Sequence, residues 1–134
     1  MKTKLALGTV ALGLLLASMP VMAHHSFAAE FDSTKPIKLT GSVTKIEWMN
    51  PHAYFYIDVK DEKTGQVANW GMEMGSPNGL MRQGWTRNSM KIGDVVIVEG
   101  SAAKDGSNIG NARSVTLSTG TRLFAASSQA PANP

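Results

Sequence analysis

The stretch from Pro36 to Lys60 constrains the fold of this chain more than any other part of the sequence. It reads as a long strand, an Asn-Pro-His corner and a second strand. In the first strand, Leu39, Gly41 and Val43 share one parity, whereas Ile46 and Trp48 share the other. Side chains alternate between the two faces of a strand, so this change of parity requires a bulge or a sharp coil. Gly41 can supply the flexibility for the bend.

The second strand alternates without interruption. One face carries Ala53, Phe55, Ile57 and Val59, and the other carries Tyr54, Tyr56 and Asp58. This is the pattern of a half-buried antiparallel strand. A first strand whose halves serve both sides of one core is typical of barrels of the OB type. The two strands therefore predict an all-β fold, a small five-stranded OB-like Greek-key barrel.

The remaining elements fit such a barrel. A third strand over residues 66–74 turns Trp70, Met72 and Met74 toward the core, and Asn69, Gly71 and Glu73 outward. Ser76-Pro77 predicts one short helix over residues 77–83, between the third and fourth strands. The run at residues 95–98 is apolar on both faces and predicts the most buried strand. Residues 111–117 form the fifth strand, and residues 122–124 form a short segment after a turn.

The N-terminus has the features of a secretory signal peptide. Lys2 and Lys4 precede an apolar run from Leu5 to Ala17, and small residues occupy the positions before a cut after Ala23. The run is too short to span a bilayer, although a retained membrane anchor is the alternative. We therefore expect a periplasmic protein without a transmembrane anchor after cleavage. The expected division is a signal peptide at 1–23, an arm at 24–36, the barrel at 37–124 and a disordered tail at 125–134. Phe27 and Phe31 can fix the arm to the barrel.

Charge and cysteine content exclude several classes of function. Loss of Lys2 and Lys4 lowers the formal net charge from +3 to +1. A nearly neutral domain lacks the basic footprint of a nucleic-acid-binding protein. The chain has no cysteine, which excludes disulfides, iron–sulfur clusters and thiol nucleophiles.

Five stretches of the mature chain resemble a known family. They are HHSFAAEFD, LTGSVTKIEWMNPHAYFYIDV, NWGMEMGSPNGLMRQGWTR, IGDVVIVEG and DGSNIGNARSVTL. Together they are similar to an exported bacterial family catalogued as domain of unknown function 6152. The resemblance implies a periplasmic OB-like domain, and it brings no established activity or functional residues.

The three histidines suggest a metal site. His24 and His25 open the mature chain, and His52 lies at the strand corner. An N-terminal histidine chelates copper through its α-amine and imidazole, and a further imidazole completes the set. Imidazole suits Cu(II), which heads the divalent affinity order. We therefore expect that His24 and His52, with His25 as a further candidate, bind one Cu(II). The alternative is that all three are polar surface residues.

The methionines suggest a Cu(I) site less strongly. They are Met49, Met72, Met74, Met81 and Met90. Thioethers are soft ligands, but Met72 and Met74 share the parity of Trp70, and methionine commonly fills irregular cores. Core packing is therefore the preferred interpretation.

A second candidate surface is the outward face of the second and third strands. It carries Tyr54, Tyr56, Asp58, Asn69 and Glu73. In OB barrels this face binds oligonucleotides or oligosaccharides, and here a glycan or a periplasmic protein partner would fit better than a nucleic acid. Ordinary cross-strand pairing is the alternative interpretation.

Signatures of an enzyme are absent from the sequence. There is no Gly-x-Ser-x-Gly elbow or phosphate loop, and the spacing of Glu47, Asp58 and Glu73 selects no acid/base pair. We therefore expect a non-catalytic binding module with no catalytic residues. The alternatives are an interaction module without metal and an accessory hydrolytic enzyme with Glu73 as general base. The sequence does not determine the oligomeric state.

Overall fold

The computed structural model of the protein describes residues 27–126, which form six strands and two short helices. The elements are α2 (Phe27–Glu30), β1 (Phe31–Glu47), β2 (Tyr54–Lys60), β3 (Val67–Glu73), α3 (Pro77–Arg82), β4 (Val95–Ala103), β5 (Ile109–Thr116) and β6 (Arg122–Phe124). Within this described part, no helix is long and apolar enough to cross a membrane.

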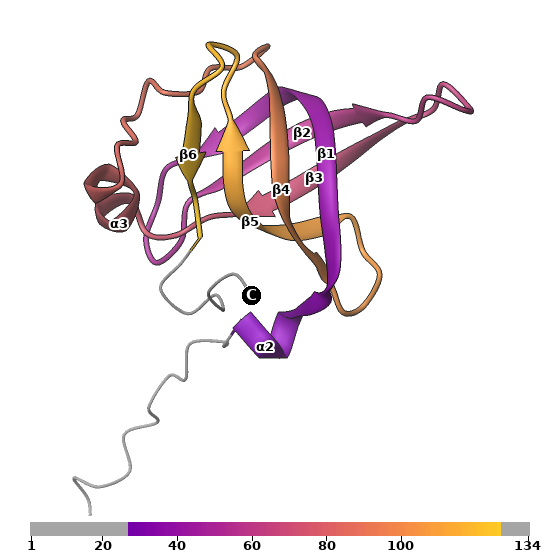
Figure 1. The fold of residues 1–134 in the computed structure, drawn as a ribbon, viewed down its shortest axis with the longest axis horizontal. Helices are drawn as coiled ribbons and strands as arrows, with labels where there is room; N and C mark the ends of the chain where they lie inside the picture. Colours follow the sequence, from indigo (N-terminus) through magenta and orange to yellow (C-terminus); the bar gives the residue numbers. More distant parts are fainter. Residues whose placement is uncertain (1–26, 127–134) are drawn as a thin grey trace, which may run out of the picture.

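The strands curl into a closed ring (Figure 1). Antiparallel pairing gives the order β3-β2-β1-β4-β5-β6, and a parallel pairing between β3 and β5 joins the two sides. Five strands thus close on themselves, and β6 lies outside the ring along β5. The all-β, barrel-like fold expected from the sequence is confirmed, while its further assignment to the OB type stays a prediction.

β1 is the longest strand and serves both sides of the ring. Its residues 31–42 pair with β4, and its residues 42–47 pair with β2. The register with β2 shifts between Val43 and Lys45, so the bulge expected from the parity change is confirmed. Its expected cause was wrong, because Gly41 lies before the bulge. A Cβ on Gly41 would meet the Asp58 carbonyl oxygen at 2.5 Å, so glycine there permits close approach of β1 and β2.

The core follows the predicted alternation of β2 and β3. Phe55, Ile57 and Met72 are fully buried, and Met74 and Leu80 join them. Met72, Met74 and Met90 therefore pack in the core, as expected, whereas Met49 and Met81 are exposed. Trp85 is also buried, and its Nε1 donates a hydrogen bond to the Phe124 carbonyl oxygen at 2.8 Å.

β4 corrects one expectation. The four apolar residues at 95–98 predicted the most buried strand, but Val95 is 54% exposed, and Ile97 is only partly buried. One face of β4 meets the core, so burial alternates along it despite the apolar run. β5 is more fully buried, because Asn111, Ala112, Ser114 and Val115 all lie inside.

α3 forms where the sequence predicted a helix. The Ser76 side chain accepts a hydrogen bond from the backbone N–H of Gly79, and Pro77 occupies the first turn. Pro77 and Leu80 are the buried residues of the helix.

The ends of the described chain extend the barrel beyond its expected limits. β1 begins at Phe31, inside the segment expected to be an arm. Phe31 is 3% exposed, and its ring centroid lies 5.6 Å from that of Phe27. Ala125 and Ala126, expected to begin the tail, are buried against the body. The Ala125 N–H donates to the Arg113 carbonyl oxygen, and the Ala125 carbonyl oxygen accepts from the Gly75 N–H. The signal peptide and the rest of the expected tail lie outside the described residues.

Candidate functional site

The polar side chains of greatest interest lie where β2 begins and β3 ends. Tyr54 and Glu73 are direct partners in the register between these strands. Their side chains lie on the outward face, and the Tyr54 hydroxyl donates to Glu73 Oε2 at 3.0 Å. The prediction from strand parity therefore placed these two residues together correctly.

His52 joins this pair from the Asn-Pro-His corner. Its Nδ1 lies 3.1 Å from the Met74 carbonyl oxygen and 3.7 Å from Glu73 Oε1. A carbonyl oxygen can only accept, so the contact with Met74 assigns the donor hydrogen to Nδ1. In a neutral imidazole the lone pair then belongs to Nε2. The corner thus fixes both the orientation of the ring and its tautomer.

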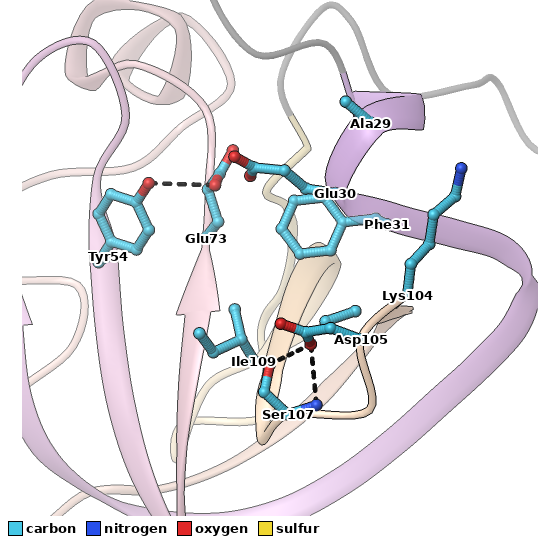
Figure 2. Close-up of a pocket in the computed structure, with 10 residues that line it drawn as sticks. Ala29, Glu30, Phe31, Tyr54, Glu73, Lys104, Asp105, Ser107 and Ile109 are labelled. Carbon is cyan, nitrogen blue, oxygen red and sulfur yellow. Dashed lines mark hydrogen bonds between the residues drawn. The ribbon is translucent and has the colours of Figure 1, made fainter.

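A cavity of about 390 Å³ opens beside Tyr54 and Glu73. Five segments of the chain line it: the junction of α2 and β1, the start of β2, the end of β3, the end of β4 with the turn after it, and the start of β5. Figure 2 shows Phe31 and Ile109 facing the cavity, with the carboxylates of Glu30 and Glu73 turned toward each other. The cavity therefore combines apolar walls with two acidic groups.

Burial raises the pKa of the Glu73 carboxyl above its ordinary value of 4.5. The negative charge of Glu30 acts in the same direction, whereas His52 and the hydrogen bond from Tyr54 favour the carboxylate. The pKa of Tyr54 is also raised, first by burial and then by the Glu73 charge. A partly buried acid of raised pKa at a cavity wall is typical of functional sites.

The remaining residues of the predicted interaction face pair with one another across the strands. Asn69 Nδ2 donates to Asp58 Oδ1 at 2.9 Å, and the two residues are register partners. Tyr56 lies across Gly71, where a Cβ would lie 3.1 Å from Tyr56 Cε1, and Lys45 Nζ is 5.3 Å from the ring centroid. The Tyr56 ring thus lies over a residue without a side chain on the paired strand and under a lysine, which favours cross-strand pairing over stacking on a sugar.

The expected metal ligands are only partly described. His24 and His25 lie outside residues 27–126, so their relation to His52 is a prediction. Within that range no three His, Cys, Asp or Glu residues are close enough together to hold a metal ion. Glu47, a further acidic candidate, pairs with Lys45 and accepts from the Tyr56 hydroxyl at 3.4 Å.

Sequence reasoning missed the cavity residues outside β2 and β3. Glu30, Asp105 and Ile109 come from segments far apart in the chain and meet only in the folded barrel. The one available signal was the presence of Phe27 and Phe31, which can fix the N-terminal arm to the barrel. It did not indicate which part of the barrel the arm contacts.

Replacing Glu73 with Gln is expected to change how stability depends on pH. The raised pKa means that folded Glu73 binds more protons than unfolded Glu73 above pH 4.5, so its contribution to stability falls as pH rises through that region. The amide keeps the size of the side chain but not its charge. Urea unfolding of both proteins from about pH 4 to about pH 8 should therefore show the variant gaining stability relative to wild type as pH rises.

The matched control is Glu62→Gln, which removes an exposed carboxylate from the loop between β2 and β3. It should leave the pH dependence of stability close to that of wild type. A Glu73→Gln protein that loses stability relative to wild type with rising pH would contradict the role of burial.

The fold and the site together define a small all-β barrel with an acidic cavity at one end. A model of a family of unknown function, DUF6152, matches residues 11–112, more than half of the chain. The chain belongs to this family. No curated protein and no solved structure matches it.

Proposed function

We propose that this protein is an exported, non-catalytic binding module whose site is the corner formed by His52 and Glu73. One observation carries the proposal: the Nδ1 hydrogen of His52 is committed to the Met74 carbonyl oxygen, beside the Glu73 carboxylate. Metal-binding histidines commonly donate their second ring N–H to a carbonyl or a carboxylate, which fixes the ring and leaves the other nitrogen for the metal. His52 has this arrangement.

The ligand proposed for this corner is one Cu(II) ion. Cleavage after Ala23 would place the α-amine and the imidazole of His24 at the new N-terminus, where they form a chelate. His52 Nε2 would supply a further donor, and His25 is an additional candidate. Nitrogen donors of this kind suit Cu(II). The ordinary pKa of an α-amine is about 8, so a metal readily displaces its proton.

The position of α2 supports a short distance between the two parts of this site. α2 begins at Phe27, and its last residue, Glu30, lies beside Glu73 at the cavity. Glu73 in turn lies 3.7 Å from His52. Three residues, His24 to Ser26, precede α2, and three residues span at most roughly 10 Å when extended. The chain therefore enters the barrel at the end that carries His52.

The test is a comparison of two N-termini on the mature protein. Protein that begins at His24 is expected to bind one Cu(II), measured by competition with a chelator of known affinity and by electron paramagnetic resonance. One extra residue before His24 displaces the amine and should weaken binding at least about tenfold, the equivalent of ~1.4 kcal/mol. His52→Ala should also weaken it, and Glu62→Gln should not. Equal copper affinity of the native and extended N-termini would disprove the copper proposal.

The two alternative functions, an interaction face without metal and a hydrolytic enzyme, are not equally supported. An interaction face for a glycan or a protein partner is less favoured, because Tyr54 and Asp58 of β2 are hydrogen-bonded to Glu73 and Asn69 of β3, and Lys45 of β1 lies over the Tyr56 ring. A hydrolytic function with Glu73 as general base is favoured by one observation, the raised pKa of this carboxyl beside a cavity. Loss of a measured turnover in Glu73→Gln protein that still folds would favour the hydrolytic function over binding.

A further inference from the structure

The cavity beside Glu73 has features that the copper proposal does not use. At about 390 Å³ it has the size of a small-ligand pocket. Phe31, which is almost fully buried, and the ring of Tyr54 form part of its wall, together with Ala103 and Ile109. Aromatic and aliphatic walls of this kind enclose the apolar body of a ligand.

The charges around the cavity are unbalanced. Glu30 and Glu73 both line it, and Figure 2 shows their carboxylates turned toward each other. No ion pair among residues 27–126 involves Glu30. Asp105 adds a third carboxylate at the rim, although its Oδ1 accepts two hydrogen bonds from Ser107.

The lysine that lines the cavity does not neutralise these groups. His52 Nδ1 lies 3.7 Å from Glu73 Oε1, but His52 is not among the residues that line the cavity. Lys104 lines the cavity, but its ammonium donates to the carbonyl oxygen of Ala28. Figure 2 shows it pointing away from Glu73. The space beside the two glutamates is therefore bordered by carboxylates and by the side chains of Phe31 and Tyr54, and a cation there would gain ion pairs with the carboxylates.

We propose that this cavity binds a small organic ammonium ion with an apolar body. The ammonium would lie between Glu30 and Glu73 and donate to both, and the apolar body would lie against Phe31, Tyr54 and Ile109. The ion pairs select for charge and the walls select for an apolar body. A simple metal cation would make only the ion pairs, and a neutral molecule would make only the apolar contacts. This site shares Glu73 with the corner that holds His52, but it uses none of the proposed copper ligands and does not require copper.

Benzylammonium is a suitable probe, and benzyl alcohol is its neutral counterpart of nearly the same shape. The mature protein would be titrated with each by two-dimensional NMR near pH 7, at constant ionic strength and with a chelator present. The chelator removes copper, so the result is independent of the copper proposal. Benzylammonium should bind saturably and shift the amide signals of Ala29, Glu30 and Ile109. Benzyl alcohol should bind at least about tenfold more weakly, as expected when a charged hydrogen-bond donor is lost.

Two matched variants test the charge. Glu30 is exposed in α2 and is not part of the core, so Glu30→Gln should fold normally and lower the affinity for benzylammonium about tenfold. Glu62→Gln removes the same charge from the loop between β2 and β3 and should leave the affinity unchanged. The proposal is overturned if benzyl alcohol binds as tightly as benzylammonium, if the two variants have equal affinities, or if no saturable shift occurs at these amides.

Discussion

Alanine in place of Gly100 is expected to destabilise the barrel by about 3 kcal/mol or more, a large part of the stability of a small domain. A Cβ at this position would lie 1.9 Å from the carbonyl oxygen of Asn111 and 2.9 Å from its carbonyl carbon. These are backbone atoms of the paired strand β5, so the contact cannot be relieved by rotating a side chain. The register between β4 and β5 shifts at Glu99 and Gly100, which brings the two backbones together there.

The control is Gly65→Ala. Gly65 has φ 74°, a conformation that disfavours alanine, but no atom lies within 4 Å of its Cβ position. Its cost should therefore be conformational only, about 1–2 kcal/mol. Urea unfolding of both variants separates the two effects. If Gly100→Ala were as stable as Gly65→Ala, the close approach of β4 and β5 would not be a constraint on the fold.

Replacing Phe55 with Ala is expected to cost about 3–5 kcal/mol of folding free energy, through lost burial and the cavity left behind. Phe55 is fully buried, and in the sheet it lies between its register partners Ile46 of β1 and Met72 of β3. It also lies between Tyr54 and Tyr56 along β2, so its packing helps to keep these two residues opposite their partners Glu73 and Gly71 in β3. Thermal unfolding followed by circular dichroism is the measurement.

Phe55→Leu is the matched control, because leucine restores most of the apolar volume. It should be clearly more stable than Phe55→Ala and should keep the near-ultraviolet spectrum of the tyrosines. Equal stability of the two variants would show that the centre of β2 contributes less to the core than its burial indicates.

Much of the fold was predictable because it depends on local patterns. The alternation in β2, the parity change in β1 and the Ser76-Pro77 helix start each involve neighbouring residues, and all three are found where the sequence placed them. The buried faces of β2 and β3 follow from the same alternation. The error at β4 has a physical cause as well: a run of apolar residues is compatible with burial on one face or on both, and periodicity does not distinguish them.

The site was predictable only in part. Strand parity put Tyr54 and Glu73 on one face, and the sequence placed His52 at the strand corner, but it did not predict that His52 lies 3.7 Å from Glu73. The cavity was not predictable, because it depends on where distant segments meet. Glu30 reaches Glu73 because β1 starts as early as Phe31 and carries α2 to that end of the barrel. The turn after β4 reaches it through the pairing of β3 with β5, which no local pattern encodes.

That parallel pairing also bears on how the chain folds. The pairing of β3 with β5 joins residues 71–73 to residues 109–111, which lie far apart in the sequence. The pairings of β2 with β3 and of β4 with β5, in contrast, join strands that follow one another directly. Contacts of high sequence separation are slow to form, because the chain entropy of the intervening loop is lost first. The ring therefore cannot close until β5 is available, and a nascent chain that ends before β5 would carry Glu73 on an open sheet, with the cavity unformed.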